Sequence, residues 1–356
     1  MKLEDFISAA SFELHQEVTW QAPSNIALIK YWGKYGEQLP KNPSLSFTLN
    51  QCVTTTTIDC QPNSSGRLSF SFEFEGQAAP EFHPKIDQFF QRIIPFQPWL
   101  KQHHLNIKSS NSFPHSSGIA SSASAMAALS IGLMDLERQG GAAISESYFY
   151  QKASFLARLG SGSAARSVQG PLCVWGETPS IPESSDLFAH PISTSVHPSF
   201  QDYQDAVLLI DKGTKVVSSS QGHALMEGHP FAERRFEQAH QQLALLKRAI
   251  ETGAVEQFIR VVESEALTLH AMMMTSQPYF ILMHPNTLAV IHKVWEYRKA
   301  NTSALCFTLD AGANVHLLYP KAEKEKVNDF IARELSVFCQ SGQYILDEVG
   351  SGVKKV

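Results

Sequence analysis

Two short segments combine cations with small or aromatic residues in a way that suits an anionic ligand. The first runs from Asn25 to Lys34 (NIALIKYWGK) and places Lys30 and Lys34 four residues apart, at the end of an apolar run. Lysines at a strand end suit a diphosphate or carboxylate, and the intervening Gly33 lets the backbone approach a ligand closely. The alternative is a strand that leaves the core with solvated lysines, and for this segment alone that alternative is favoured.

The second candidate anion site runs from Leu159 to Ser167 (LGSGSAARS). Backbone N–H groups and Ser hydroxyls can hold oxygen atoms here, while the Arg166 guanidinium can fork onto a carboxylate or phosphate. A flexible linker is the alternative interpretation. The apolar segments on both sides and the single Arg argue against it.

A third segment is defined by missing charge, because residues 109–134 contain no Asp, Glu, Lys or Arg. A membrane span needs about 20 predominantly apolar residues, but the first half of this run is rich in hydroxyl groups. We interpret PHSSGIASSA (residues 114–123) as a phosphate loop that opens a helix, whose free N–H groups and positive dipole end face the ligand. Since the loop carries no Walker lysine, the backbone would hold most of the phosphate oxygens. A Ser-rich loop that merely caps a buried helix remains open as the alternative.

Asp310 is the only formally charged residue between Ala300 and Pro320, and it follows the apolar run ALCFTL. A lone carboxylate among apolar neighbours is costly unless it has a partner or a task. It could accept or orient the proton of a substrate hydroxyl. The alternative is an Asx-type turn residue that bonds to its own backbone.

Composition limits the class of protein. The chain has 356 residues, of which 43% are hydrophobic and 18% charged, which predicts a globular protein of two domains. The net charge of −5 offers no broad basic surface for nucleic acid. Five widely spaced cysteines without a CxxC indicate reduced thiols. The histidines form no HExxH motif, so we do not expect a metal held entirely by side chains. The N-terminal residues lack an apolar signal region, so we expect a cytoplasmic protein without a membrane segment.

The elements that must position these residues are mixed helices and strands in both halves. The first half predicts strands at 53–59, 68–74 and 171–175, with helices starting at Pro84 and spanning 119–138 and 145–159. Residues 179–203 lack periodicity, and the domain boundary is placed there, giving domains 1–200 and 201–356. The second half predicts strands at 206–211, 304–309, 315–319 and 343–346, and helices at 230–251, 254–273, 286–299 and 321–335.

Taken together, the four segments resemble the diphosphomevalonate decarboxylase branch of the GHMP small-molecule kinase superfamily. NIALIKYWGK, the FPxxxGIASSA phosphate loop, GSGSAARS and DAGAN stand in the family's order and near its spacing, from Asn25 to Asn314. Three departures are visible: His115-Ser116-Ser117 where Thr-Ala-Ala is common, Ala125 where a Gly is common, and Ala313 where Pro is usual. We expect these departures to affect the affinity of the chain for its nucleotide, or its preference among nucleotides.

The resemblance implies an α+β fold, with an N-terminal domain like ribosomal protein S5 domain 2 and a ferredoxin-like C-terminal domain around a shared cleft. It implies ATP-dependent decarboxylation of (R)-5-diphosphomevalonate to isopentenyl diphosphate, with Mg²⁺ bound through ATP, and a homodimer. The implied catalytic residues are Asp310, Arg166 and Lys30. The implied substrate-binding residues are Tyr31, Trp32, Gly33, Lys34, Ser161, Gly162, Ser163, Ala164, Ala165 and Arg166. The implied ATP-binding residues are Pro114, Ser116, Ser117, Gly118, Ala120, Ser121 and Ser122.

Within these roles, Asp310 would position or deprotonate the substrate hydroxyl and Arg166 would hold the departing carboxylate. Lys30 would lie close to Asp310. Two other functions stay open: a sibling enzyme, either a mevalonate 3-kinase or a phosphomevalonate decarboxylase, and a nucleotide-binding protein without turnover.

Overall fold

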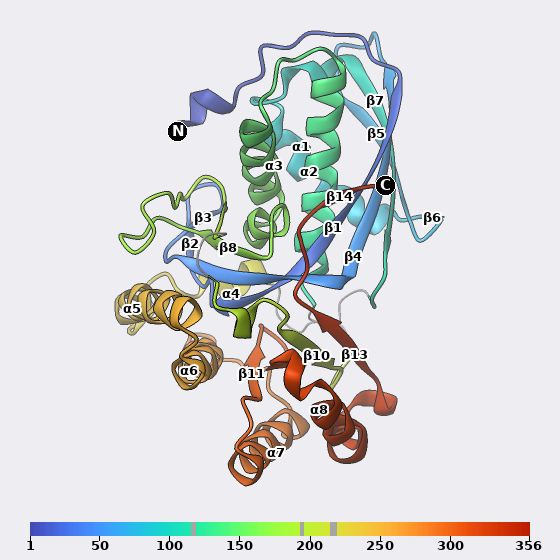
Figure 1. Cartoon of the computed structure of the whole chain (residues 1–356). Helices are drawn as coiled ribbons and strands as arrows, with labels where there is room; N and C mark the ends of the chain where they lie inside the picture. Colours follow the sequence, from blue (N-terminus) through green and yellow to red (C-terminus); the bar gives the residue numbers. More distant parts are fainter. Residues whose placement is uncertain (115–118, 193–195, 214–218) are drawn as a thin grey trace.

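The computed structural model describes residues 1–114, 119–192, 196–213 and 219–356 of the chain. Figure 1 shows two units, one built mainly from the first half of the chain and one from the second half. In the described part of the chain, each unit contains a largely antiparallel sheet with helices packed against it.

The first unit is built on two long antiparallel strands that pair over most of their length. Along the second of them, residues 52–60 alternate between buried and half-buried positions, as expected of a strand with one face on a core. In the described residues the sheet runs β14-β1-β4-β7-β5-β6, with β8 on β4 and β9 on β8. The strands are β1 (Gln16–Ile29), β4 (Ser44–Pro62), β5 (Ser69–Phe74), β6 (Gln77–Ala78), β7 (His103–Asn111), β8 (Leu172–Trp175), β9 (His190–Pro191) and β14 (Lys354–Lys355), and a separate hairpin pairs β2 (Lys34–Tyr35) with β3 (Leu39–Pro40).

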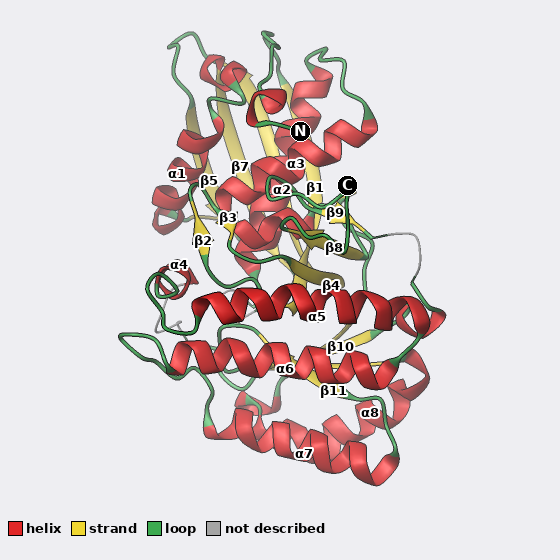
Figure 2. Cartoon of the chain, turned by 90° about the vertical axis from the view of Figure 1, so that its left-hand side faces the viewer, coloured by secondary structure: helices red, strands yellow, loops and turns green. Residues whose placement is uncertain are grey.

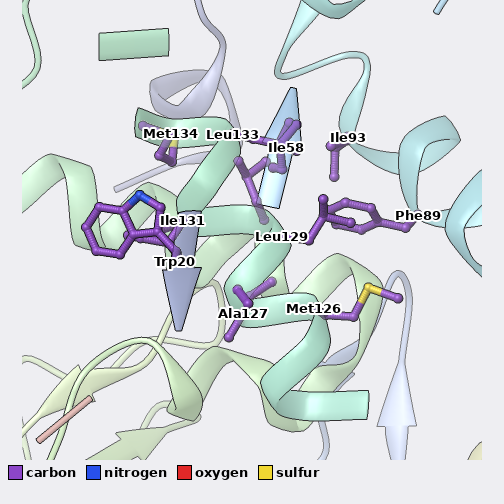
Figure 3. Packing of buried hydrophobic residues seen from close by; sticks show 14 of the residues in the cluster. Trp20, Ile58, Phe89, Ile93, Met126, Ala127, Leu129, Ile131, Leu133 and Met134 are labelled. Atoms are coloured by element: carbon purple, nitrogen blue, oxygen red, sulfur yellow. The ribbon is translucent and has the colours of Figure 1, made fainter. Parts of the chain in front are cut away.

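Three helices, α1 (His83–Ile93), α2 (Ser121–Gln139) and α3 (Glu146–Gly160), cover one face of this sheet (Figure 1). Figure 3 shows the core between them, where Trp20 and Ile58 of the sheet meet Leu129 of α2 and Phe89 of α1. Helix α2 is buried along nearly its whole length, and each large apolar side chain buried there contributes about 1.5–3 kcal/mol. The charge-free run therefore enters a core helix.

The second unit has a sheet of order β11-β12-β10-β13 in the described residues. Its strands are β10 (Gln204–Leu208), β11 (Cys306–Leu309), β12 (Val315–Tyr319) and β13 (Tyr344–Glu348), and its helices are α4 (Ser219–Ala224), α5 (Ala232–Thr252), α6 (Val255–Met274), α7 (Pro285–Asn301) and α8 (Lys324–Phe330). In Figure 2 the long helices α5, α6 and α7 lie side by side. No helix of the described residues is long and apolar enough to cross a membrane.

The two units share a continuous apolar contact. Phe47 of β4 packs against Tyr203 and Phe258, whose rings lie 5.2 Å apart, and Leu243 of α5 belongs to the same buried cluster. The chain end also returns to the first sheet, where Lys355 of β14 pairs with Trp20 of β1. The buried cluster also includes Ile29 of β1 and Cys306 of β11, the two strands that precede the candidate catalytic residues. The domain division at 200/201 stays a prediction.

Candidate active site

Lys30 and Asp310 meet where the two units join. Lys30 directly follows β1 and Asp310 directly follows β11, and the Lys30 Nζ lies 2.8 Å from the Asp310 Oδ1. The lysine side chain is 2% exposed and the aspartate side chain 28% exposed, so the carboxylate has the more open side. Burial lowers the pKa of Lys30, while the Asp310 charge opposes that shift. The arrangement joins a buried cation to a carboxylate that a ligand can reach.

Arg166 brings a second cation to this place. It lies in the short 3₁₀ helix η4 (Gly162–Ser167) and is 2% exposed. Its Nε and Nη1 find no hydrogen-bond partner within the described parts of the chain. Burial lowers the pKa of Arg166 to about 10, and the nearby Asp310 charge works in the opposite direction. A buried guanidinium with unused donors is costly, and its fork geometry suits a substrate carboxylate.

Tyr31 lies beside Arg166, and its hydroxyl is buried without a partner among the described residues. Its ring and that of Trp175 meet edge to face with their centroids 4.7 Å apart, and the centroid of the His223 ring lies 4.1 Å away. Burial raises the pKa of the phenol, so Tyr31 stays a hydrogen-bond donor at neutral pH. The unused hydroxyl and the Arg166 donors give this region several groups able to bind oxygen atoms.

The turn after Tyr31 is fixed by a residue from the second unit. Gly33 has φ +95, a conformation that favours glycine, and a Cβ at this position would lie 3.0 Å from the Phe236 ring. The Gly33 N–H donates to the Nδ1 of His223 at 3.0 Å. The Trp32 side chain packs in an apolar cluster with Leu269 and neighbouring methionines. Its predicted role in binding substrate stays a prediction.

Lys34 stands at the start of the β2–β3 hairpin, half-buried, with its Nζ 3.0 Å from the Gln38 Oε1. Burial lowers its pKa, and the Arg92 charge adds to this. Lys34 and Arg166 both act electrostatically on His223. The two cations that the sequence placed in separate motifs therefore both help to lower the pKa of one imidazole.

The Gly/Ser segment forms the turn into η4. Gly162, Ala164 and Ala165 are buried, whereas Ser161 and Ser163 are half-buried. A Cβ on Gly162 would lie 2.9 Å from the Tyr31 Oη, so the absence of a side chain lets the segment pack against Tyr31. The Asn25 amide donates to the Ser163 carbonyl at 3.1 Å and connects this segment to β1. The small residues bring the segment close to Tyr31.

Residues 115–118 of the predicted phosphate loop, which include Ser116, Ser117 and Gly118, lie outside the described residues. The described end begins α2: Ala120 is left-handed with φ +47, and Ser121 starts the helix. The Ser122 Oγ accepts a hydrogen bond of 2.7 Å from Lys85 on α1. Pro114 is exposed at the other end of the loop. The start of α2 thus offers first-turn N–H groups and a hydroxyl, which suit phosphate oxygens.

The donor set of the site suits a nucleotide with Mg²⁺ bound through its phosphates. The described residues contain no group of three or more His, Cys, Asp or Glu side chains placed to hold a metal ion. Mg²⁺ commonly binds through substrate phosphates and only one or two carboxylates. The partly exposed Asp310 and the α2 start are compatible with that mode.

Four residues around the site carry no signal in the sequence. His223 holds the Gly33 N–H, Arg235 and Glu265 hold the main chain of Lys30, and the His270 Nε2 donates to the Asp310 carbonyl at 3.1 Å. Arg235, Glu265 and His270 lie on helices whose pattern predicts only packing, and His223 lies on the short α4, which the sequence pattern did not predict. Their contacts depend on the meeting of distant segments, which no local motif records.

Comparisons with known proteins agree over most of the chain. Residues 22–187 match the model of a diphosphomevalonate decarboxylase-like N-terminal domain, and residues 206–351 match that of a mevalonate 5-diphosphate decarboxylase C-terminal domain. The diphosphomevalonate decarboxylase of Ganoderma lucidum is 28% identical over 344 residues, covering 89% of this chain and 82% of that protein. The Saccharomyces cerevisiae enzyme of the same name is 28% identical over 332 residues, covering 87% and 79%.

Solved structures show the same fold. Mevalonate diphosphate decarboxylase from Staphylococcus aureus superposes with a TM-score of 0.83 at 28% identity, covering 96% of this chain and 98% of the other. The protein abbreviated MDDEF, solved in complex with MVAPP, AMPPCP and magnesium, superposes with a TM-score of 0.81 at 28% identity, covering 96% and 99%. The expected two-domain α+β fold of the GHMP type is confirmed.

Proposed function

The chain belongs to the diphosphomevalonate decarboxylase family, and from this premise we propose that it decarboxylates (R)-5-diphosphomevalonate in an ATP-dependent reaction of the mevalonate pathway. The products are isopentenyl diphosphate, ADP, phosphate and CO2. The observation that carries the proposal is the Lys30–Asp310 contact beside Arg166, which puts a reachable carboxylate next to two cations.

Asp310 has the chemistry to begin the reaction. Its carboxylate orients the C3 hydroxyl or accepts its proton as the hydroxyl oxygen bonds to the γ-phosphorus of ATP and ADP leaves. Lys30, at 2.8 Å, favours the ionised form of Asp310. When bound through ATP oxygens, Mg²⁺ supplies positive charge that offsets the charge developing on the phosphates.

Arg166 acts in the second half of the reaction. The C3–O bond breaks, phosphate leaves, and positive charge develops at C3. The bond between the carboxylate carbon and C2 then breaks, CO2 leaves, and the electron pair forms the C2–C3 double bond. The unused Nε and Nη1 of Arg166 supply two donors for the carboxylate and align it for departure.

The diphosphate end of the substrate is assigned to Tyr31, Lys34 and the Ser161–Ser163 segment. The buried Tyr31 hydroxyl is a donor, Lys34 is a half-buried cation, and the two serines keep part of their surface accessible. Neither motif contains an Asp or Glu that would repel an anion, so these groups suit the oxygen atoms of a diphosphate. At the other end, the first turn of α2, with Ser121 and Ser122, is assigned to the ATP phosphates.

One assay separates this function from its alternatives. Purified protein is incubated with ATP, Mg²⁺ and 5-diphosphomevalonate, and the released CO2 and free phosphate are measured. Parallel reactions contain mevalonate or 5-phosphomevalonate in place of the diphosphate. Equal release of CO2 and phosphate from the diphosphate is expected. A phosphorylated product without CO2 would indicate a kinase. Turnover of the monophosphate alone would indicate a sibling decarboxylase, and no turnover of any of the three substrates would indicate a binding protein.

We also propose that the protein works in the cytoplasm as a homodimer. All five cysteines are unpaired and buried, which suits a reducing compartment. The dimer is supported by the family resemblance. Sedimentation equilibrium of the purified protein tests it, and a single species with the mass of one chain would contradict it.

A further inference from the structure

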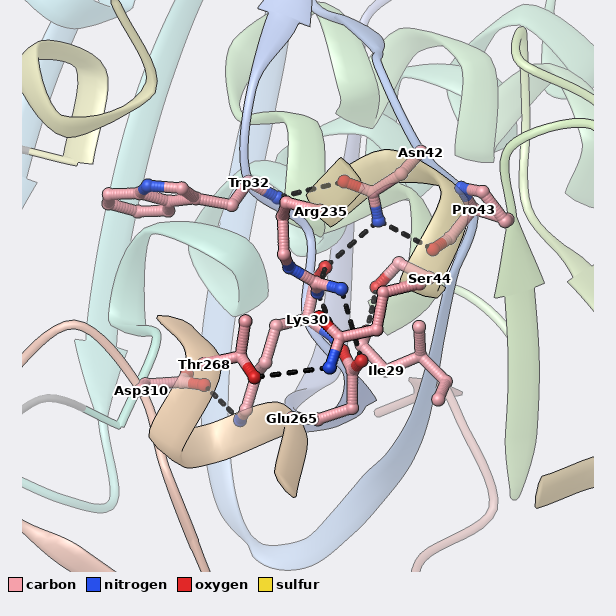
Figure 4. A network of polar contacts seen from close by, with 11 residues as sticks. Ile29, Lys30, Trp32, Asn42, Pro43, Ser44, Arg235, Glu265, Thr268 and Asp310 are labelled. Atoms are coloured by element: carbon pink, nitrogen blue, oxygen red, sulfur yellow. Dashed lines mark hydrogen bonds and ion pairs between the residues drawn. The ribbon is translucent and has the colours of Figure 1, made fainter. Parts of the chain in front are cut away.

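Both main-chain groups of Lys30 are held by one buried ion pair from the second unit (Figure 4). The Lys30 N–H donates to the Glu265 Oε2 at 2.8 Å, and the Lys30 carbonyl accepts from the Arg235 Nη2 at 3.1 Å. Arg235 also bonds both oxygens of Glu265, at 3.1 and 2.6 Å. The Asn42 amide adds a further bond of 3.0 Å to the same carbonyl. The backbone position of Lys30 is therefore set by α5 and α6 as well as by its own strand.

The same helix holds the main chain of Asp310. His270 stands five residues after Glu265 on α6, and its Nε2 donates to the Asp310 carbonyl at 3.1 Å. Five residues of α-helix rise about 7.5 Å, so one rigid element contacts both members of the Lys30–Asp310 pair. A shift of α6 would therefore act on the main chain of both residues.

The ion pair is unusual in its burial. The Arg235 side chain is 1% exposed and that of Glu265 is 0% exposed. A buried ion pair often stabilises a fold no better than well-packed apolar residues of similar volume. Core packing alone therefore gives little reason for this pair at this position. Its contacts to both main-chain groups of a catalytic lysine supply a reason.

We propose that Glu265 and His270 of α6, with Arg235 of α5, are positioning residues of the decarboxylation reaction, which fix the separation of Lys30 and Asp310. The inference rests on the proposed function for its kinetic consequence, because a group moved by as little as about 1 Å can lower a rate about 10²-fold. Its structural consequence, the Lys30 Nζ–Asp310 Oδ1 distance, is measured independently of activity.

Glu265→Gln tests the ion pair with little change in volume, and Glu263→Gln is its matched control. Glu263 lies on the same helix two residues earlier and pairs with Arg298 of α7 at 2.5 Å, away from Lys30. We expect Glu265→Gln to lower kcat by roughly 10- to 100-fold with KM for ATP and substrate within about 2-fold. Glu263→Gln should keep both constants.

A second pair of variants tests His270 in case Glu265→Gln does not fold. His270→Gln keeps an N–H donor near the Nε2 position, whereas His270→Leu removes it. The leucine variant should lose kcat by about 10-fold or more, and the glutamine variant should recover most of it. Equal losses in the two variants would mean that the ring only fills space, and would overturn this part of the proposal.

Crystal structures of the wild type, Glu265→Gln and His270→Leu give the decisive distance. We expect the Lys30 Nζ–Asp310 Oδ1 separation of 2.8 Å to lengthen beyond hydrogen-bond range in at least one variant. An unchanged distance in both variants overturns the inference whatever their activity. A wild-type protein that shows the contact but releases no CO2 would instead overturn the proposed function, and the distances would still decide the positioning role.

Discussion

Lys30 and Asp310 are 280 positions apart in the chain, and their side chains meet at 2.8 Å between Nζ and Oδ1. Each residue follows the end of a strand, β1 for Lys30 and β11 for Asp310, and the two strands belong to different sheets. The candidate catalytic pair exists only when the two units are packed together.

Asp310→Asn should abolish most of the turnover and leave binding largely intact. The amide keeps the size of the side chain but cannot accept a proton, so we expect kcat to fall by about 10²- to 10⁴-fold. Steady-state kinetics and titration calorimetry with 5-diphosphomevalonate measure the two effects. Asp329→Asn, which only removes an exposed ion pair with Arg333, is the control. A near-normal kcat in Asp310→Asn would show that another group does this work.

Arg166→Met should separate stability from activity. The substitution removes two buried guanidinium nitrogens that lack partners within the described parts of the chain, and each such group costs about 1–3 kcal/mol. We expect the free energy of unfolding in urea to stay equal or rise, while kcat falls by at least about 100-fold through loss of the carboxylate ligand. Lower stability with retained kcat would contradict the proposed role.

Lys34→Ala should weaken substrate binding more than catalysis. A hydrogen bond to a charged group contributes about 1.5–3 kcal/mol, so KM for 5-diphosphomevalonate should rise by about 10- to 100-fold with kcat changed little. Lys41→Ala serves as the control, because its Nζ lies over the exposed Tyr35 ring at 5.4 Å. Equal effects of the two substitutions would indicate general electrostatics instead of a specific contact.

Acid should destabilise the protein through His223 and His270. Burial lowers their pKa to about 3 and about 4, below the usual 6.5. At pH values between these lowered pKa values and 6.5, the unfolded chain binds more protons than the folded one. The free energy of unfolding therefore falls as the pH drops below 6.5. For His223 the loss between pH 7 and pH 5 is about 2 kcal/mol. Urea unfolding at both pH values should show a smaller loss in His223→Met, and an identical loss would contradict this assignment.

Local pattern predicted much of the fold. The alternating residues Phe70, Phe72 and Phe74 predicted the strand found as β5, and Pro84 predicted the start of α1. The pattern of both halves also predicted the long helices, because amphipathic spacing is a property of neighbouring residues. Isolated charges in apolar or small-residue surroundings are visible without coordinates, and they singled out Lys34, Arg166 and Asp310. The role of Lys30 came only from the family resemblance.

Only the tertiary structure decided which of these residues meet and what holds them. The contact of Lys30 with Asp310 and the bond of Gly33 to His223 join segments that are 280 and 190 positions apart. Glu265 reads in the sequence as one more polar residue on a helix, yet it is fully buried and holds the Lys30 N–H. Such contacts depend on how sheets and helices pack, which is a balance over the whole chain. Local spacing therefore records the chemistry of a side chain but not its partner.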